Sequence, residues 1–92
     1  MPDLLHEYWE NADGDGEFGP VREHNDQRRD RIAPGAKLVF SLMAPSWHHA
    51  MRLYHERLGY GEYLPTEGVL DHVYTAAEAA EQNAYLQVRE RR

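Results

Sequence analysis

Oxygen-bearing side chains occupy every second position of one short segment near the start of the chain. Asn11, Asp13 and Asp15 alternate with small residues, and Gly16 and Glu17 follow. A calcium loop of the EF-hand type begins in the same way, with side-chain oxygens at positions 1, 3 and 5, a glycine at 6 and a binding backbone carbonyl at 7. The segment therefore predicts a calcium site that uses Asn11, Asp13, Asp15 and Glu17.

The match to this motif is incomplete at its far end. Position 12 of such a loop is a glutamate that binds calcium with both oxygens, whereas this chain has Arg22 there and Glu23 one residue later. One residue turns a helical side chain by about 100°, so Glu23 would point away from the ion. The alternative interpretation is a turn that needs Asn, Asp and Gly for backbone reasons alone. The sequence predicts no cofactor.

A second group of residues that could do chemistry is the set of six histidines: His6, His24, His48, His49, His55 and His72. A metal ion bound by one helix needs ligands three or four residues apart, whereas His48 and His55 are separated by two turns, about 10.5 Å along the axis. Ordinary solvated histidines are therefore the preferred interpretation. A histidine-dependent enzyme that uses His48, His49 and His55 stays open as an alternative.

Nucleophilic catalysis lacks suitable residues. The chain has no cysteine, and its two serines, Ser41 and Ser46, fall in a predicted strand and at a predicted helix cap. The Gly-x-Ser-x-Gly pattern that exposes a catalytic serine is also missing. The sequence therefore names no catalytic residue and favours a protein that is not an enzyme.

Charge and composition exclude two classes of partner. The net charge is −6, and residues 1–20 hold six of the 16 acidic residues but no lysine or arginine. An acidic lobe repels nucleic acid and anionic membranes. The chain also lacks cysteine and any apolar run near the ~20 residues that span a bilayer. We therefore expect a soluble cytoplasmic protein without nucleic-acid or membrane partners.

Two helices are predicted in the first third of the chain. Asp3 is a suitable N-cap for a short helix over residues 3–11, which would end in the acidic loop. Pro20 suits the first position of a second helix over residues 20–32, because its missing N–H is not needed there. The second helix has few apolar residues, so we expect it to be mostly solvated.

Two further helices have clearer boundaries. Ser46 and Gly59 are typical cap and stop residues for a helix over residues 47–58, whose apolar side chains recur at 3.6-residue spacing. Thr75 begins a capping box for a helix over residues 76–90. Both boundaries depend on local backbone chemistry.

One apolar segment, residues 37–43, predicts a buried strand, and residues 69–74 suggest a second, short one. The predicted class is α+β and mainly helical, with three to four helices around a small sheet element in one domain, residues 1–92. The predicted core consists of eight side chains: Trp9, Val39, Phe40, Leu42, Trp47, Met51, Tyr54 and Leu58.

Two sequence elements within residues 8–65 resemble those of a known protein family. The first is Glu17-Phe18-Gly19-Pro20, and the second combines Ser46-Trp47, Ala50-Met51, Tyr54, Gly59-Tyr60-Gly61, Tyr63 and Pro65. Together they resemble a family of small uncharacterised bacterial proteins with a Glu-Phe-Gly-Pro and a Ser-Trp-x-x-Ala-Met element. The resemblance implies no activity, cofactor or site.

The preferred functional hypothesis is a protein-interaction module. The chain has two Trp, six Tyr and two Phe residues, more rings than a small core easily hides. Tyr60, Tyr63 and Leu64 lie beside glycines and form a predicted docking patch, since tyrosine is favoured at interfaces. We therefore expect a non-catalytic protein that binds another protein or itself, with a homodimer as one form. Calcium binding and histidine-dependent catalysis are the alternatives.

Overall fold

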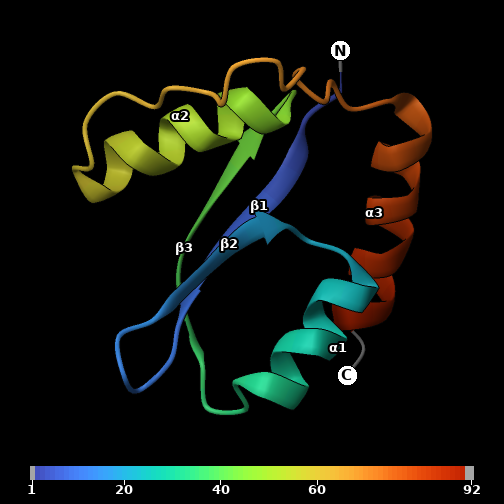
Figure 1. The fold of residues 1–92 in the computed structure, drawn as a ribbon. Helices are drawn as coiled ribbons and strands as arrows, with labels where there is room; N and C mark the ends of the chain where they lie inside the picture. Colours follow the sequence, from blue (N-terminus) through green and yellow to red (C-terminus); the bar gives the residue numbers. More distant parts are fainter. Residues whose placement is uncertain (1, 91–92) are drawn as a thin grey trace.

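A three-stranded antiparallel sheet and three helices make up residues 2–90, the part of the chain that this computed structural model describes (Figure 1). In chain order the elements are β1 Leu4–Glu10, β2 Gly16–Pro20, α1 Glu23–Ile32, β3 Lys37–Ala44, α2 Trp47–Leu58 and α3 Ala76–Glu90. The strand order is β2-β1-β3, so the first strand of the sequence is central. The chain is α+β, and the prediction of a mainly helical chain around a small sheet element is wrong, because the sheet has three strands.

The predicted helix over residues 3–11 is the strand β1. Its alternate side chains point to opposite faces of the sheet, with His6 and Tyr8 on one face and Glu7 on the other. Both faces are covered, so His6, Glu7 and Tyr8 are all buried. A strand buried on both sides shows no alternation of apolar and polar residues. The spacing of its apolar residues could therefore be mistaken for that of a helix.

The predicted acidic loop is the turn of a hairpin between β1 and β2, which pair antiparallel from Glu10 with Gly16 to His6 with Pro20. Gly14 supplies a positive φ of 86° in the turn, a conformation that other residues rarely adopt. Gly16 is required for a different reason, because a Cβ atom there would collide with the ring of Tyr8. Pro20 therefore ends a strand, and the helix predicted over residues 20–32 begins at Glu23.

The predictions for α2 and α3 are confirmed. The hydroxyl oxygen of Ser46 accepts a hydrogen bond from the backbone N–H of His49, and Gly59 ends α2 with a left-handed φ of 72°. At the start of α3, Thr75 and Glu78 exchange side-chain to backbone hydrogen bonds at 3.0 and 3.1 Å. None of the helices within residues 2–90 is long and apolar enough to cross a membrane.

The helices cover both faces of the sheet (Figure 1). On one face, Trp47 and Tyr54 of α2 contact rings of the sheet. On the other face, α1 places Arg29 over the ring of Trp9, and α3 places Gln82 against the backbone of Leu5. The sheet is thus the middle layer that positions the helices.

The core differs from the predicted one, because Phe40 alone among the eight predicted side chains is classed as buried. The buried apolar side chains are Leu4, Tyr8, Val21, Phe40, Ala44, Ala50, Tyr74 and Tyr85. Of the predicted set, Val39 is 49% exposed and the others are partly buried. The prediction that residues 37–43 form a buried strand is therefore wrong for the side chains of β3 that face away from α2.

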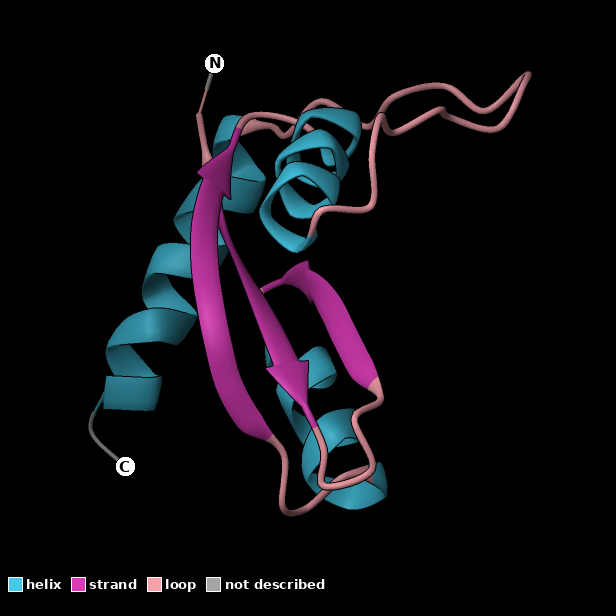
Figure 2. Cartoon of the chain, turned by 90° about the vertical axis from the view of Figure 1, so that its left-hand side faces the viewer, coloured by secondary structure: helices cyan, strands magenta, loops and turns pink. Residues whose placement is uncertain are grey.

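Residues 60–73, here called the arm, connect α2 to α3 without regular secondary structure and project from the domain (Figure 2). The predicted strand over residues 69–74 is reduced to a single bridge between Val73 and Ser46. Several apolar side chains of the arm are exposed, among them Leu64 at 75% and Leu70 at 90%.

Candidate functional site

The outer edge of β3 is the first candidate site. β3 pairs with β1 on one side, and no described strand pairs with its other side. In an antiparallel strand, alternate residues direct their backbone N–H and C=O groups to the same edge. The free edge of β3 therefore offers a row of donors and acceptors that another strand could use.

Apolar side chains lie along this edge on the face opposite α2. In the register of β1 and β3, Met43 lies opposite Leu5, Ser41 opposite Glu7, and Leu38 opposite Trp9. Directly paired residues share a face, so these β3 side chains lie on the face of α1 and α3. Leu38 and Met43 are nevertheless 47% and 52% exposed.

A bulge adds a further apolar residue to this surface. The register shifts between Tyr8 and Trp9, so Val39 has no direct partner on β1. A bulge of this kind places two successive residues of one strand against one residue of the other. Val39, 49% exposed, therefore joins Leu38 and Met43 in what we call the β3 surface (Leu38, Val39, Ser41 and Met43).

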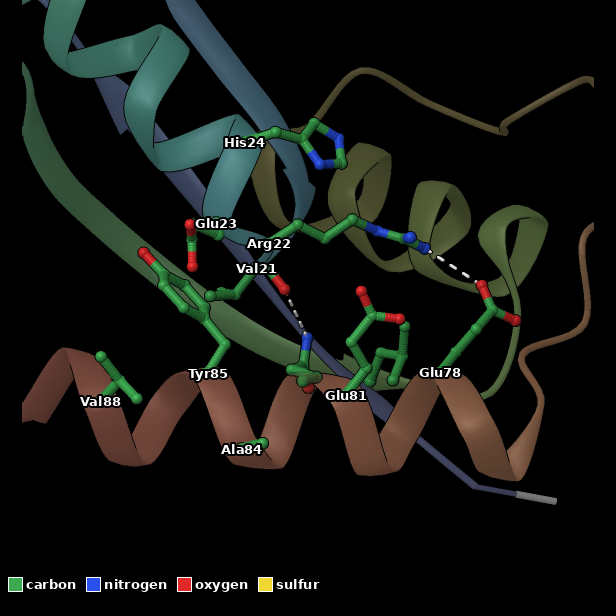
Figure 3. A pocket seen from close by; sticks show the side chains of 11 residues that line it. Val21, Arg22, Glu23, His24, Glu78, Glu81, Ala84, Tyr85 and Val88 are labelled. Carbon is green, nitrogen blue, oxygen red and sulfur yellow. Dashed lines mark hydrogen bonds and ion pairs between the residues drawn. The ribbon is translucent and has the colours of Figure 1, made fainter.

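A groove between the start of α1 and the length of α3 is the second candidate site (Figure 3). Its cavity volume is about 320 Å³, at the lower end of the range of roughly 300–1,000 Å³ for small-molecule sites. Eleven residues line it: Leu4, Val21, Arg22, Glu23, His24, Glu78, Glu81, Gln82, Ala84, Tyr85 and Val88. The apolar members form its floor, and the charged members stand around it.

One charged pair of the groove is satisfied by its own neighbours. The guanidinium of Arg22 donates to Glu78 at 3.2 Å, and His72 lies 2.9 Å from the same carboxylate. The backbone N–H of Thr75, together with His72 and Arg22, lowers the pKa of Glu78 to about 2. Glu78 is therefore a fixed negative charge that neutralises Arg22.

A buried His–Tyr pair is a site that the sequence did not predict. Nε2 of His6 lies 2.7 Å from the hydroxyl of Tyr74, and Nδ1 lies 3.0 Å from the carbonyl of Leu4. A carbonyl only accepts, so Nδ1 carries the proton and the Tyr74 hydroxyl donates to Nε2. Burial lowers the pKa of His6 to about 4 and raises that of Tyr74 to about 12, so both groups stay neutral.

The structure gives the predicted calcium residues other partners. Oδ1 of Asn11 accepts hydrogen bonds from the backbone N–H groups of Asp13 and Asp15, both at 3.0 Å. The carboxylate of Glu17 is bonded to Arg28 of α1. Within residues 2–90, no group of three or more histidine or acidic side chains is arranged to hold a metal ion. The turn explains these residue types without an ion, and calcium binding stays a prediction.

The predicted docking patch is partly engaged with α2. Tyr60 and Leu64 are 60% and 75% exposed. Tyr63 instead packs against His48 and His55, with ring centroids 5.9 and 5.1 Å apart. Two of the three histidines proposed for catalysis, His48 and His55, thus contact the same ring, that of Tyr63.

The third histidine of that hypothesis has a local role. His49 donates its backbone N–H to the cap residue Ser46, and its ring lies 3.5 Å from Arg52. Asp71 lies beside His48 and accepts a hydrogen bond from its backbone N–H at 2.8 Å. The hydrogen bond from His48 to Asp71 joins the arm to α2, and the enzyme hypothesis stays a prediction.

Comparisons with known proteins do not identify a function for these sites. No family model, no curated protein and no solved structure matches the chain. The resemblance to a small bacterial family therefore stays a prediction, and any function must be argued from the surfaces themselves.

Proposed function

We propose that this protein is a non-catalytic interaction module that associates with a second copy of itself through β3. The observation that carries the proposal is an eight-residue edge strand whose outer edge pairs with no described strand and which has three apolar side chains about half exposed. Exposed apolar edge strands are sites at which chains pair. We also propose that the protein is cytoplasmic, as expected from the sequence.

The sequence of β3 suits pairing with itself. An antiparallel pair centred on Ser41 would set Val39 opposite the partner's Met43, and Met43 opposite the partner's Val39. Both residues lie on the β3 surface, and cross-strand apolar pairs stabilise a sheet by about 0.2–1 kcal/mol each. The same pairing would bury the exposed apolar side chains of both copies.

The edge also lacks the usual protection against pairing. Natural edge strands carry charged residues or proline that block a second strand. Among the eight residues of β3, Lys37 at its first position is the sole charged side chain. A charge at the end of a strand leaves the central residues free to pair.

The size of the contact sets its expected strength. One strand contributes eight residues, whereas a standard interface has about 20–30 residues on each side. We therefore expect a dissociation constant above about 1 µM, with monomer and dimer exchanging as the concentration changes.

Sedimentation velocity across protein concentrations from about 5 to 500 µM tests the proposal, because this range extends well above the lower bound expected for the dissociation constant. The edge variant is Val39→Lys with Met43→Lys, which places like charges opposite each other in the proposed pair. The matched control is Leu64→Lys with Leu70→Lys, which adds the same charge on the exposed arm.

We expect the wild-type protein and the arm control to dimerise with rising concentration and the edge variant to stay monomeric. Circular dichroism checks that all three proteins are folded. A wild-type protein that is monomeric at every concentration would contradict the proposal. Loss of association in the arm control but not in the edge variant would instead assign the interface to the docking patch around Tyr60 and Leu64.

A further inference from the structure

The floor of the groove between α1 and α3 combines three buried side chains that are mainly apolar, Leu4, Val21 and Tyr85, with the side chain of Gln82. Leu4 and Val21 are 1% and 2% exposed, and Tyr85 is 8% exposed. The side chain of Gln82 donates to the carbonyls of Leu5 at 2.9 Å and Val21 at 3.1 Å. These carbonyls are therefore already satisfied.

Two carboxylates on opposite sides of this floor are available to a ligand. Glu23 begins α1 and Glu81 lies on α3, and both are exposed (Figure 3). Glu81 makes no hydrogen bond or ion pair with any residue in the described part of the chain. Glu23 accepts one hydrogen bond, at 3.3 Å, from the neutral amide of Gln27.

The positive groups of the groove do not cancel these two charges. Arg22 is held by Glu78, which is itself ionised. Figure 3 shows the ring of His24 on the side of Arg22 away from α3. The groove thus combines an apolar floor with an excess of negative charge, which favours a cation and repels an anion.

We propose that this groove binds a small organic cation, that is, an ammonium group on an apolar body. The ammonium lies between Glu23 and Glu81 and donates charge-assisted hydrogen bonds to them. The apolar body covers Val21, Tyr85 and Val88, the last of which is 51% exposed. This site is separate from the β3 surface, so the inference does not depend on self-association.

The volume and the lining favour this class of ligand over two others. A cavity of about 320 Å³ accommodates a small molecule rather than a folded segment of a partner. Calcium and magnesium need about six or more oxygen ligands, and within residues 2–90 no group of three or more histidine or acidic side chains is arranged to hold a metal ion. An apolar floor would also contribute nothing to a metal ion.

An NMR titration of the full chain with phenethylamine tests this assignment. The neutral isostere 2-phenylethanol is the matched probe, because it keeps the ring and chain but lacks the positive charge. The variant is Glu23→Gln with Glu81→Gln, which keeps the shape of both side chains. The control is Glu67→Gln, which removes an exposed carboxylate from the arm.

We expect phenethylamine to shift the amide signals of residues 21–24 and 81–88 in a saturable way. The alcohol should bind about fivefold more weakly, since it cannot form the two exposed charge pairs, each of which contributes modestly. The double variant should lose a similar factor for the amine, and the control should match the wild-type protein. Titration in the edge variant Val39→Lys with Met43→Lys should give the same result.

Three results would overturn the inference. Equal affinities for the amine and the alcohol would show that the positive charge of the amine does not contribute to binding. Unchanged amine binding in the double variant would show that these carboxylates are not the partners. Signals that shift away from the groove, or do not shift at all, would remove the site.

Discussion

The two faces of the sheet are held by opposite kinds of interaction. On the face of α2, stacked and tilted rings fill the space: His6 lies 5.5 Å from Phe18 and 6.2 Å from Trp47, and Tyr8 lies 5.3 Å from Phe40. Ring packing contributes mainly through buried apolar area. This face is therefore stabilised by close packing.

The opposite face is held by buried charges. Asp26 of α1 accepts hydrogen bonds from Arg29, at 2.8 Å, and from the hydroxyl of Tyr85 on α3. Arg89 of α3 reaches Glu7 of β1 at 2.7 Å. Glu7, Asp26 and Arg29 are all buried. This network joins α1, α3 and β1, and a buried charge is tolerated only while its partners are in place.

The difference between the faces predicts how the stability of the protein responds when a side chain is removed from each face. Removing a ring leaves a cavity whose cost depends on lost contacts. Removing one member of a charge network leaves its partners buried without compensation. The β3 surface lies on the face of α1 and α3, yet its apolar side chains stay about half exposed, which is why we assign the interface there.

The largest effect is expected for Phe40→Ala on the ring-packed face. Phe40 is 8% exposed and lies between Tyr8 and Tyr54. Loss of its ring should lower the free energy of unfolding by about 3–4 kcal/mol, measured by urea unfolding with tryptophan fluorescence. The control Val39→Ala changes a half-exposed neighbour of the same strand and should lose less than about 1 kcal/mol. Equal losses in the two variants would show that the two sides of β3 are packed alike.

A smaller effect is expected for Asp26→Ala on the charged face. The change leaves Arg29 and the Tyr85 hydroxyl without their shared acceptor. We expect a loss of about 2–3 kcal/mol, because Arg29 is buried and would keep its charge without this carboxylate. The control Asp30→Ala removes an exposed carboxylate from the same helix and should change stability by less than about 0.5 kcal/mol. A loss no larger than that of the control would mean that the network contributes no stability.

The third prediction concerns His6, a fully buried histidine on the ring-packed face. The pKa of His6 is about 4 in the folded protein and 6.5 in its unperturbed state. The unfolded chain therefore binds a proton first as the pH falls, and stability should decrease between pH 6.5 and 4. The part due to His6 is about 2 kcal/mol between pH 7 and pH 5.

Comparison of urea unfolding at pH 7 and pH 5 in His6→Gln and wild type isolates this part. The variant should lose less stability on acidification than the wild-type protein, by about 2 kcal/mol. His24→Gln, at an exposed position, should behave like the wild type. The same loss on acidification in His6→Gln and wild type would contradict a neutral, buried His6.

The elements that the sequence predicted well have boundaries set by neighbouring residues. Ser46 and Gly59 bound α2, and Thr75 with Glu78 caps α3, each through hydrogen bonds or dihedral angles within a few positions. β1 was mistaken for a helix because the sheet covers it on both faces, a property decided by distant segments. The hairpin turn resembles the first half of a calcium loop because both need Asn, Asp and Gly, so these residue types alone do not distinguish the two.

The candidate sites were less predictable, because they join residues far apart in the chain. The sequence found β3 but not its place at the edge, which depends on β1 pairing between the two other strands. The groove combines residues from Leu4 to Val88, and the Glu7–Arg89 pair spans most of the chain. No local pattern marks such contacts, although buried charges become plausible once both faces of β1 are known to be covered.

The most direct test of the proposed interface is hydrogen exchange of the β3 amides, read by NMR at two protein concentrations. In a monomer, the amides of β3 that point to the free edge are open to water and exchange rapidly. Our account predicts that these amides, within residues 38–43, exchange more slowly at about 500 µM than at about 20 µM, while those bonded to β1 do not change. Exchange rates that are the same at both concentrations would contradict pairing through β3.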